Sequence, residues 1–356
     1  MNNLEKMQGI LTGGKADALL LTSQVSRHYA ACYDVAEGVA VVGREKSFYF
    51  TDSRYIEVAQ NELKGFTVLE TNREHTYPAR INAVLEELGA KTLGIEEAYL
   101  THREYLHYEE TLHAQLVPCQ KEISAFRQIK EDWEIDYMVK AQEITDRTFD
   151  EMCTLLKPGM TEKEVAAELI YRLLKNGADG LSFDPIVVSG PNTSMPHGVA
   201  GERIIQEGDF VTMDFGVLYQ GYCSDMTRTV AMGYATEEME KVYNTVLQAQ
   251  LAGIAATRAG VIGKDIDGAA RKVITDAGYG EYFGHGYGHS LGLEIHESPN
   301  TNPGNSSPMP AGAVCSAEPG IYIPGKFGVR IEDVVVVTET GCEDITRSPK
   351  NLIIVK

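Results

Sequence analysis

The chain has 356 residues, 43% of them hydrophobic and 23% charged, a balance typical of a globular protein long enough for two domains. Its formal net charge of −19 argues against a nucleic-acid ligand, because phosphates require a basic surface. No apolar run approaches the roughly 20 residues of a membrane span, and the first residues lack the apolar stretch of a secretory signal.

The chain up to Pro118 alternates short apolar runs with amphipathic segments. Runs rich in Val, Leu and aromatic residues predict strands at 18–22, 38–42, 48–51, 92–96 and 115–118. Apolar residues at helical spacing predict helices at 53–63 and 78–88. This alternation predicts an α/β domain. Five histidines lie within it, at no shared spacing that suggests a site.

A break after Pro118 separates this domain from a second one. Residues 122–156 are charged and helix-forming, and they predict one long helix that ends at Lys157-Pro158-Gly159. Thr161-Glu162-Lys163-Glu164 has the form of a capping box and predicts another helix to about residue 176. Strands and glycine-rich turns follow, interrupted by helical patterns at 237–258 and 264–277. We therefore expect an N-terminal domain of residues 1–122 and an α+β domain of residues 123–356.

The cysteines are scattered along both expected domains. There is no CxxC pair and no zinc-ribbon spacing among them. The six are Cys32, Cys119, Cys153, Cys223, Cys315 and Cys342. We interpret them as reduced thiols of a cytoplasmic protein.

Two aspartates lie in consecutive β-prone runs. Asp214 lies within 210–216 and Asp225 within 222–230, and the residues between these runs predict an antiparallel hairpin. A turn centred between Tyr219 and Gln220 would place the two aspartates directly opposite each other, with Cβ atoms roughly 5 Å apart. Like charges so opposed destabilise a sheet unless a cation lies between them, as in a paired-metal site. The alternative is a turn cap, or an ion pair with Arg228.

Three histidines, His285, His289 and His296, are interleaved with glycines that forbid a regular helix. Neutral imidazole is a common metal ligand and also suits acid–base roles. The segment lacks the Gly-Lys-Ser/Thr of a phosphate-binding loop and the helical H-E-x-x-H zinc pattern. A single histidine here would more often be structural, but three together favour a functional site.

Two glutamates and one more histidine complete the candidate set. Glu318 and Glu332 lie in β-prone runs, where a buried charge requires a partner or a metal. The alternative is an outward position on an edge strand or, for Glu332, an ion pair with Arg330 on the same strand face. His197 follows Met195-Pro196, so every histidine beyond residue 113 falls in one of these candidate segments.

In their order along the chain, these residues resemble the pita-bread metallopeptidases, a group that includes aminopeptidase P, prolidase, methionine aminopeptidase and the metal-free relative creatinase. The matching elements are an Asp with a second Asp eleven residues later, HGxGH with a further His, Glu-Pro-Gly, and Arg-x-Glu-Asp. The likeness covers essentially the whole chain, since Thr51-Asp52-Ser53-Arg54-Tyr55 resembles a segment of the creatinase/prolidase N-terminal domain. The resemblance implies an α/β N-terminal domain of that type and an α+β pita-bread catalytic domain.

By this resemblance, five side chains hold two divalent metal ions: Asp214, Asp225, His289, Glu318 and Glu332. The implied ions are Mn²⁺ or Co²⁺, with Zn²⁺ or Fe²⁺ as alternatives, and a set of O and N ligands fits them. A hydroxide bridging the ions would attack the peptide carbonyl, and Glu318 would shuttle the proton to the leaving nitrogen. His197 and His296 would hydrogen-bond the substrate, while His285, Tyr322 and Arg330 would support the site.

The resemblance also implies a substrate with proline at its second position, because ordinary methionine aminopeptidases lack the N-terminal domain. Many prolidases carry an Arg where this chain has Asn300, and another is often found at the position of Gly304. This departure favours an aminopeptidase P-like enzyme, with Xaa-Pro dipeptidase (prolidase) activity as the alternative. Since related enzymes are often dimers, a homodimer is expected, and neither nucleic acid nor membrane is expected as a partner.

Two other functions are compatible with the same fold. A creatinase-like hydrolase would need no metal, and a non-catalytic binding protein would need no active site. Creatinase-like enzymes do not need all five ligands, and binding proteins of this fold usually lose some. All five are present in this sequence. Both alternatives therefore rank below a metallopeptidase.

Overall fold

The structure is a computed structural model that describes residues 2–356, and the chain divides into two compact units, Met1–Arg127 and Gln128–Lys356. Helix α6 (Gln120–Arg127) closes the first unit, so the division lies slightly beyond the expected one between residues 122 and 123. Within the described residues, no helix combines the length and the apolar character needed to cross a membrane.

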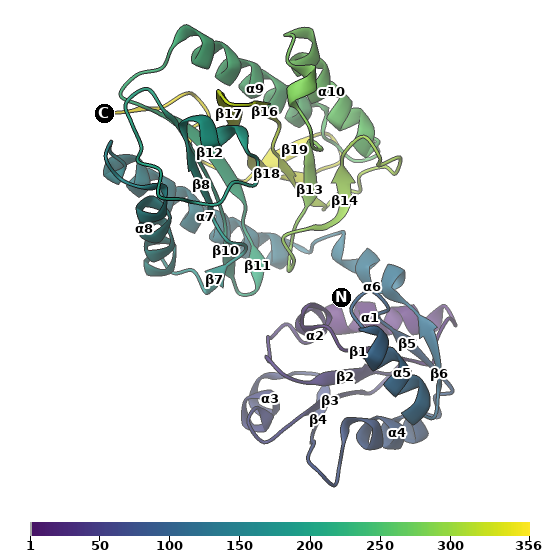
Figure 1. Cartoon of the computed structure of the whole chain (residues 1–356). Helices are drawn as coiled ribbons and strands as arrows, with labels where there is room; N and C mark the ends of the chain where they lie inside the picture. The colour runs from purple at the N-terminus through teal and green to yellow at the C-terminus, as the bar shows by residue number, and fades with distance from the viewer. Residues whose placement is uncertain (1) are drawn as a thin grey trace. The chain divides into compact units, whose positions relative to one another are not determined.

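The N-terminal unit is built on a six-stranded sheet in the order β4-β3-β2-β1-β5-β6 (Figure 1). Its strands are β1 (Ala18–Leu21), β2 (Val39–Val42), β3 (Ser47–Thr51), β4 (Phe66–Glu70), β5 (Thr92–Ile95) and β6 (Gln115–Pro118). Its other helices are α1 (Asn3–Thr12), α2 (Gln24–Ala31), α3 (Ile56–Glu62), α4 (Tyr77–Leu88) and α5 (His102–Thr111). Strand β2 runs antiparallel to both neighbours, whereas β3–β4 and β1–β5–β6 pair in parallel.

The five predicted strands and two predicted helices of this unit all have counterparts in the structure, but α1, α2, β4 and α5 are not predicted from the sequence. Helix α5 begins at a capping box formed by Thr101 and Glu104, and it contains no buried residue. It therefore lacks the apolar stripe from which an amphipathic helix is recognised in a sequence.

The second unit contains the helices α7 (Asp132–Leu155), α8 (Glu162–Lys175), α9 (Glu237–Ala256) and α10 (Gly263–Asp276). The prediction of a single helix over 122–156 is wrong, because the chain is not helical between α6 and α7. Lys130 lies in this break: its N–H donates to the carbonyl of Gly312 at 2.9 Å, and its Nζ lies 3.0 Å from Glu297 Oε2. Both side chains of this ion pair are buried, so a tertiary contact sets the break.

Two larger sheets and two small ones complete this unit. The four-stranded sheet has the order β20-β12-β9-β8, and the five-stranded sheet has the order β14-β13-β15-β18-β19. The strands of the first are β8 (Ile186–Ser189), β9 (Phe210–Phe215), β12 (Met226–Met232) and β20 (Ile354–Val355). Those of the second are β13 (Gly288–Ser290), β14 (Glu297–Thr301), β15 (Val314–Ala317), β18 (Asp333–Val337) and β19 (Cys342–Asp344). The short strands are β7 (Gly180–Leu181), β10 (Val217–Tyr219), β11 (Tyr222–Cys223), β16 (Gly320–Ile323) and β17 (Phe327–Arg330).

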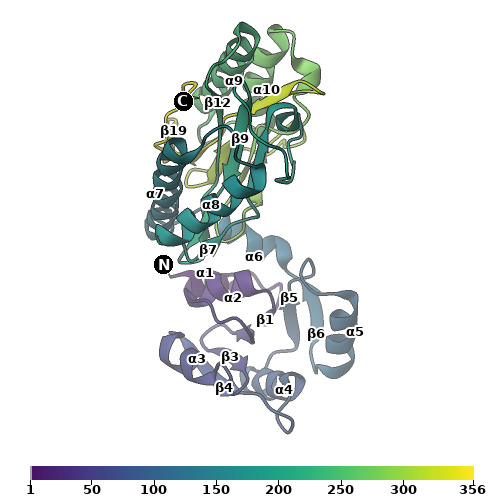
Figure 2. The ribbon, with the colours of Figure 1, turned by 60° about the vertical axis from the view of Figure 1, so that its left-hand side comes forward.

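Hydrophobic cores pack the helices of this unit against its two larger sheets. Phe149 of α7 and Leu169 of α8 share one hydrophobic core with Met213 of β9. Val246 of α9 and Ile274 of α10 share another core, which extends to the five-stranded sheet. Figures 1 and 2 show the two helix pairs over different parts of the unit. Burial of these apolar side chains holds both sheets in place, and the five candidate metal ligands lie on strands or strand ends of both.

Candidate metal centre

The hairpin that carries Asp214 and Asp225 closes one residue later than its sequence suggests. Tyr219 pairs with Tyr222, and Gln220 and Gly221 between them have positive φ angles of 50° and 81°. Two such residues form a two-residue type I′ turn. The prediction that the aspartates face each other is therefore wrong. Asp214 pairs with Thr227, two residues beyond Asp225.

This shift of two residues does not separate the aspartates. Side chains alternate between faces with a period of two, so residues 225 and 227 belong to the same face of the extended chain. Thr227 occupies the position opposite Asp214, and Asp225 lies diagonally from it, directly before β12. The negative charge of Asp214 still acts on Asp225.

Four of the proposed ligands gather within a few ångströms. Asp225, His289 and Glu332 each offer one ligand atom, and these atoms lie within 4.8 Å of one another. His289 Nε2 lies 3.6 Å from Asp225 Oδ2 and 3.3 Å from Glu318 Oε1. His289 belongs to β13, whereas Glu318 follows β15 and Glu332 precedes β18. The cluster thus joins the two larger sheets, and Asp214 on β9 adds the fifth proposed ligand, a fourth carboxylate, beside it.

Two carboxylate oxygens of this cluster need a further partner. Asp214 Oδ1 and Glu332 Oε1 are buried, and neither has a hydrogen-bond partner in the described part of the chain. The second oxygen of each is occupied, since Arg330 donates to Asp214 Oδ2 and Thr227 Oγ1 donates to Glu332 Oε2 at 2.6 Å. Leaving a buried carboxylate oxygen unpaired is costly. The residues therefore fit a cation bound between them.

The electrostatics of the cluster support the same conclusion. Burial raises the pKa of Asp225 well above its ordinary value, and the charge of Asp214 adds to this effect. Burial also raises the pKa of Glu332 and of Glu318. Burial lowers the pKa of His289, which favours the neutral imidazole that binds metals. The negative charges of carboxylates held so close together are not balanced by the surrounding protein. Divalent cations with a preference for O and N ligands would balance them.

The three predicted supporting residues form a hydrogen-bonded chain beside the cluster. His285 Nε2 lies 2.9 Å from the hydroxyl of Tyr322, and Arg330 Nη1 donates to that hydroxyl at 2.8 Å. The ion pair of Arg330 is formed with Asp214, not with Glu332 as one alternative supposed. Arg330 thus orients Asp214, whereas Glu332 accepts its hydrogen bond from Thr227.

The two predicted substrate-contacting histidines are both exposed. The ring centroid of His296 lies 4.4 Å from that of His289. Burial lowers the pKa of His296, the charge of His289 adds to this effect, and His197 also acts on it. His197 lies in the loop that follows the short 3₁₀ helix η1 (Gly190–Ser194). Both side chains are therefore close to the cluster and accessible to a ligand.

Several polar residues of the site are not identified by the sequence reasoning. Ser316 Oγ donates to Glu318 Oε1 at 3.0 Å and accepts from the N–H of His289 at 3.1 Å. Thr227 binds Glu332 as described above. Each lies two residues from a candidate carboxylate, Ser316 before Glu318 and Thr227 after Asp225. The strand period of two was the available signal, because it places such neighbours on the same face.

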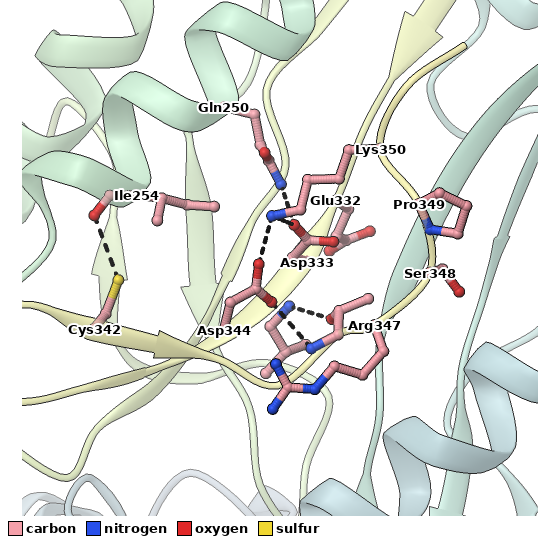
Figure 3. A network of polar contacts seen from close by, with 12 residues as sticks. Gln250, Ile254, Glu332, Asp333, Cys342, Asp344, Arg347, Ser348, Pro349 and Lys350 are labelled. Atoms are coloured by element: carbon pink, nitrogen blue, oxygen red, sulfur yellow. Dashed lines mark hydrogen bonds and ion pairs between the residues drawn. The ribbon is translucent and has the colours of Figure 1, made fainter. Parts of the chain in front are cut away.

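A second buried acidic group lies next to the cluster, formed by Arg228, Gln250, Asp333, Asp344 and Lys350; we call it the Asp333 network. Figure 3 shows Gln250, Lys350 and Asp344 around Asp333, close to Glu332. Arg228 Nη2 lies 2.6 Å from Asp333 Oδ1, and Arg228 Nη1 donates to the backbone carbonyls of Thr227 and Glu332. The alternative in which Arg228 pairs with Asp214 or Asp225 is therefore wrong; its ion pair is with Asp333.

Both units of the chain match known protein families. The model of metallopeptidase family M24 matches residues 136–339, which is more than half of the chain. The model of the creatinase/prolidase N-terminal domain matches residues 3–129. The chain is 41% identical over 352 residues to the Bacillus subtilis protein described as uncharacterized peptidase YqhT, with 99% of both chains covered.

Two solved structures are similar over nearly their full length. The Xaa-Pro dipeptidase from Bacillus anthracis has a TM-score of 0.95 and 40% identity, with 99% of each chain covered. The X-Pro aminopeptidase from Thermotoga maritima has a TM-score of 0.93 and 35% identity, with 100% of each chain covered. The predicted fold, a creatinase-type N-terminal domain followed by a pita-bread catalytic domain, is confirmed by these matches.

Proposed function

The chain belongs to metallopeptidase family M24, and we propose that it is a dinuclear-metal peptidase that hydrolyses Xaa-Pro bonds. Asp214, Asp225, His289, Glu318 and Glu332 would hold the two cations. The observation that carries this proposal is the set of buried carboxylates whose oxygens lack a protein partner at Asp214 and Glu332. A metal-free hydrolase would not require this group of buried carboxylates with unpaired oxygens.

When bound, the two cations would lower the pKa of a water to near neutrality and polarise the scissile carbonyl. Glu318 is placed to move a proton, because Ser316 occupies its Oε1 and leaves Oε2 to carry the proton toward the leaving nitrogen. His197 and His296 would donate hydrogen bonds to substrate oxygens, a contribution of about 3–4 kcal/mol per donor to an oxyanion.

Among Xaa-Pro substrates, we place dipeptides first and longer peptides second. The similar structure with the higher identity is an Xaa-Pro dipeptidase, and an X-Pro aminopeptidase follows. This order reverses the one expected from Asn300 and Gly304. Asn300 lies on β14, and its carbonyl accepts a hydrogen bond from Asn305 Nδ2 at 2.6 Å. The segment is thus held in place by contacts of its own.

The test is a hydrolysis assay with Xaa-Pro dipeptides, Xaa-Pro-Yaa tripeptides and matched peptides in which alanine replaces proline. We expect cleavage of the Xaa-Pro bonds, fastest in dipeptides, lost on chelation and restored by Mn²⁺. An Asp225→Asn variant is the control for metal-dependent turnover. Turnover that survives removal of the metal would exclude the dinuclear mechanism, and a metal-loaded protein that leaves every Xaa-Pro bond intact would exclude the substrate.

We further propose Mn²⁺ as the native ion, a homodimeric assembly and a cytoplasmic location. The O and N ligand set supports Mn²⁺ over ions that prefer thiolates. All six cysteines are free in the structure, a pattern typical of reducing compartments. Metal analysis of protein purified without added metal, together with sedimentation velocity, would test the first two proposals. A monomer or a different resident metal would contradict them.

A further inference from the structure

We infer that Glu162 is a positioning residue of the active site, whose buried carboxylate fixes the loop that carries His197. The inference rests on the proposed peptidase function, in which His197 contacts the substrate. Glu162 is the first residue of α8 and is 0% exposed. It is not one of the proposed metal ligands.

The carboxylate of Glu162 accepts four hydrogen bonds. Its Oε1 accepts from the N–H of Ser189 at 2.7 Å, from Ser189 Oγ at 2.9 Å and from Asn192 Nδ2 at 3.0 Å. Its Oε2 accepts from the N–H of Gly201 at 3.0 Å. Ser189 and Asn192 precede His197 in the chain, and Gly201 follows it. One side chain therefore joins both ends of the loop.

This contact is distinct from capping of the helix. Thr161 and Glu164 form the capping box of α8: Glu164 Oε2 accepts from the N–H of Thr161 at 2.7 Å. Glu162 has no part in that pair, and its carboxylate is directed to the loop. The four hydrogen bonds that the buried carboxylate accepts all come from the loop segment, so its role concerns the loop and not the helix end.

The far side of the loop is attached to the metal centre. Arg330 Nη1 donates to the carbonyl of Pro196 at 3.2 Å, directly before His197, and Arg330 also binds Asp214. The N–H of Gly328 donates to Thr193 Oγ1 at 2.8 Å. Glu162 thus holds the base of the loop while Arg330 holds the residue beside His197. Fixing both ends of a short loop limits the positions that its central side chain explores.

The geometry requires a carboxylate at this position. Ser189 Oγ already accepts from Arg203 at 2.6 Å, so its own proton is directed to Glu162. In Glu162→Gln an NH₂ group replaces one of the two carboxylate oxygens. In one orientation this NH₂ would face the N–H of Gly201, and in the other it would face the donors from Ser189 and Asn192. The substitution keeps the volume of the side chain but leaves a donor unpaired. The loop would then be held less firmly at one end.

The experiment combines Glu162→Gln with His197→Ala in a double-mutant cycle on Xaa-Pro hydrolysis. Since small displacements of a positioned group reduce rates by about 10²-fold, we expect Glu162→Gln to lower kcat/KM by about 10- to 100-fold. In the His197→Ala background the same substitution should change kcat/KM by less than about threefold. The metal content should equal that of the wild type. Hydrogen exchange should accelerate in residues 190–201 and not in the ligand strands.

Glu202→Gln is the matched control, because this exposed carboxylate lies in the same segment and its ion pair, with the exposed Lys163 at 2.6 Å, is a surface contact. It should leave kcat/KM and hydrogen exchange unchanged. If Glu162→Gln does not fold, Asn192→Ala removes one of the four donors and should lower kcat/KM by about threefold, again only when His197 is present.

Three results would overturn the inference. One is wild-type kcat/KM in Glu162→Gln, and another is an equal loss with and without His197. The third is unchanged hydrogen exchange in residues 190–201. The last readout needs no substrate, so it decides the role of Glu162 even if the wild type cleaves no Xaa-Pro peptide. A wild type that cleaves no Xaa-Pro peptide would refute the proposed function and leave the role of Glu162 to the exchange measurement.

Discussion

Glu332 and Asp333 are neighbours in the sequence, yet they belong to two buried acidic groups of opposite character. Glu332 faces the proposed metal centre, and Asp333 is the hub of the Asp333 network (Figure 3). Both side chains are almost completely buried, at 1% and 0% exposure. Adjacent residues of an extended chain point to opposite faces, so one dipeptide supplies both groups.

The two groups differ in where their positive charge comes from. Burial opposes ionisation of Asp333, but Arg228 and Lys350 outweigh it, and the pKa of Asp333 is lowered. Burial raises the pKa of Glu332, and the negative charge of Asp225 raises it further. Asp333 is compensated by charges of the chain itself, whereas the four carboxylates of the metal centre have Arg330 as their cation and so form a site for an external cation.

The largest expected effect would come from Glu332→Gln. Activity should fall by at least about 1,000-fold, equivalent to about 4 kcal/mol, because one of the five proposed metal ligands is lost. Without metal, the free energy of unfolding should stay the same or increase, since a poorly compensated buried charge is removed while the amide oxygen still accepts from Thr227. Steady-state kinetics and urea unfolding of the chelated protein measure both effects. A marked loss of stability in the chelated variant would contradict the comparison.

Arg228→Met should lower the free energy of unfolding, which Glu332→Gln leaves unchanged or raises. This loss of stability should be somewhat smaller than the loss of transition-state stabilisation in Glu332→Gln. It leaves Asp333 buried with only Lys350 as a counter-charge, and breaking such a pair typically costs about 3–5 kcal/mol. Urea unfolding should show this loss with and without bound metal. Lys326→Met, which breaks an exposed pair with Glu238, is the control and should leave the unfolding midpoint unchanged. A loss confined to the metal-loaded protein would mean that Arg228 serves the metal centre instead.

The smallest expected effect concerns pH. Burial raises the pKa of Asp344 to about 6, the charge of Asp333 adds to this, and Lys350 opposes it. Because this folded-state pKa lies above the ordinary value of 3.8, protonation favours the folded state, and the contribution disappears as the pH rises through 6. From about pH 5 to about pH 7.5, the wild type should lose about 1 kcal/mol of stability relative to Asp344→Asn.

This pH effect is measured as the difference between urea unfolding curves of the two proteins across the range. Acidic groups outside the Asp333 network titrate equally in both, so they cancel. Parallel stability profiles would show that Lys350 keeps Asp344 ionised in the folded protein. The Asp333 network would then be fully compensated, which would sharpen its contrast with the metal centre.

Local features of the chain are predictable from the sequence because they depend on neighbouring residues. Thr161 and Glu164 form the expected capping box, and five of the six strands of the N-terminal unit follow their apolar runs. The glycine-separated histidines and the embedded glutamates mark the chemistry of the site because charged groups in β-prone segments need a partner. The family resemblance follows from the same residues, and the family matches confirm it.

Partners distant in the sequence are decided only by the tertiary structure. The break before α7 depends on Lys130 reaching Glu297, and the pairing of Asp214 with Thr227 depends on which residues of the turn accept positive φ. Neither Arg228 nor Glu162 reveals its role by spacing, because their partners lie in other elements. Periodicity assigns a side chain to a face of a strand or helix, but only packing determines which opposite charge, if any, meets it there.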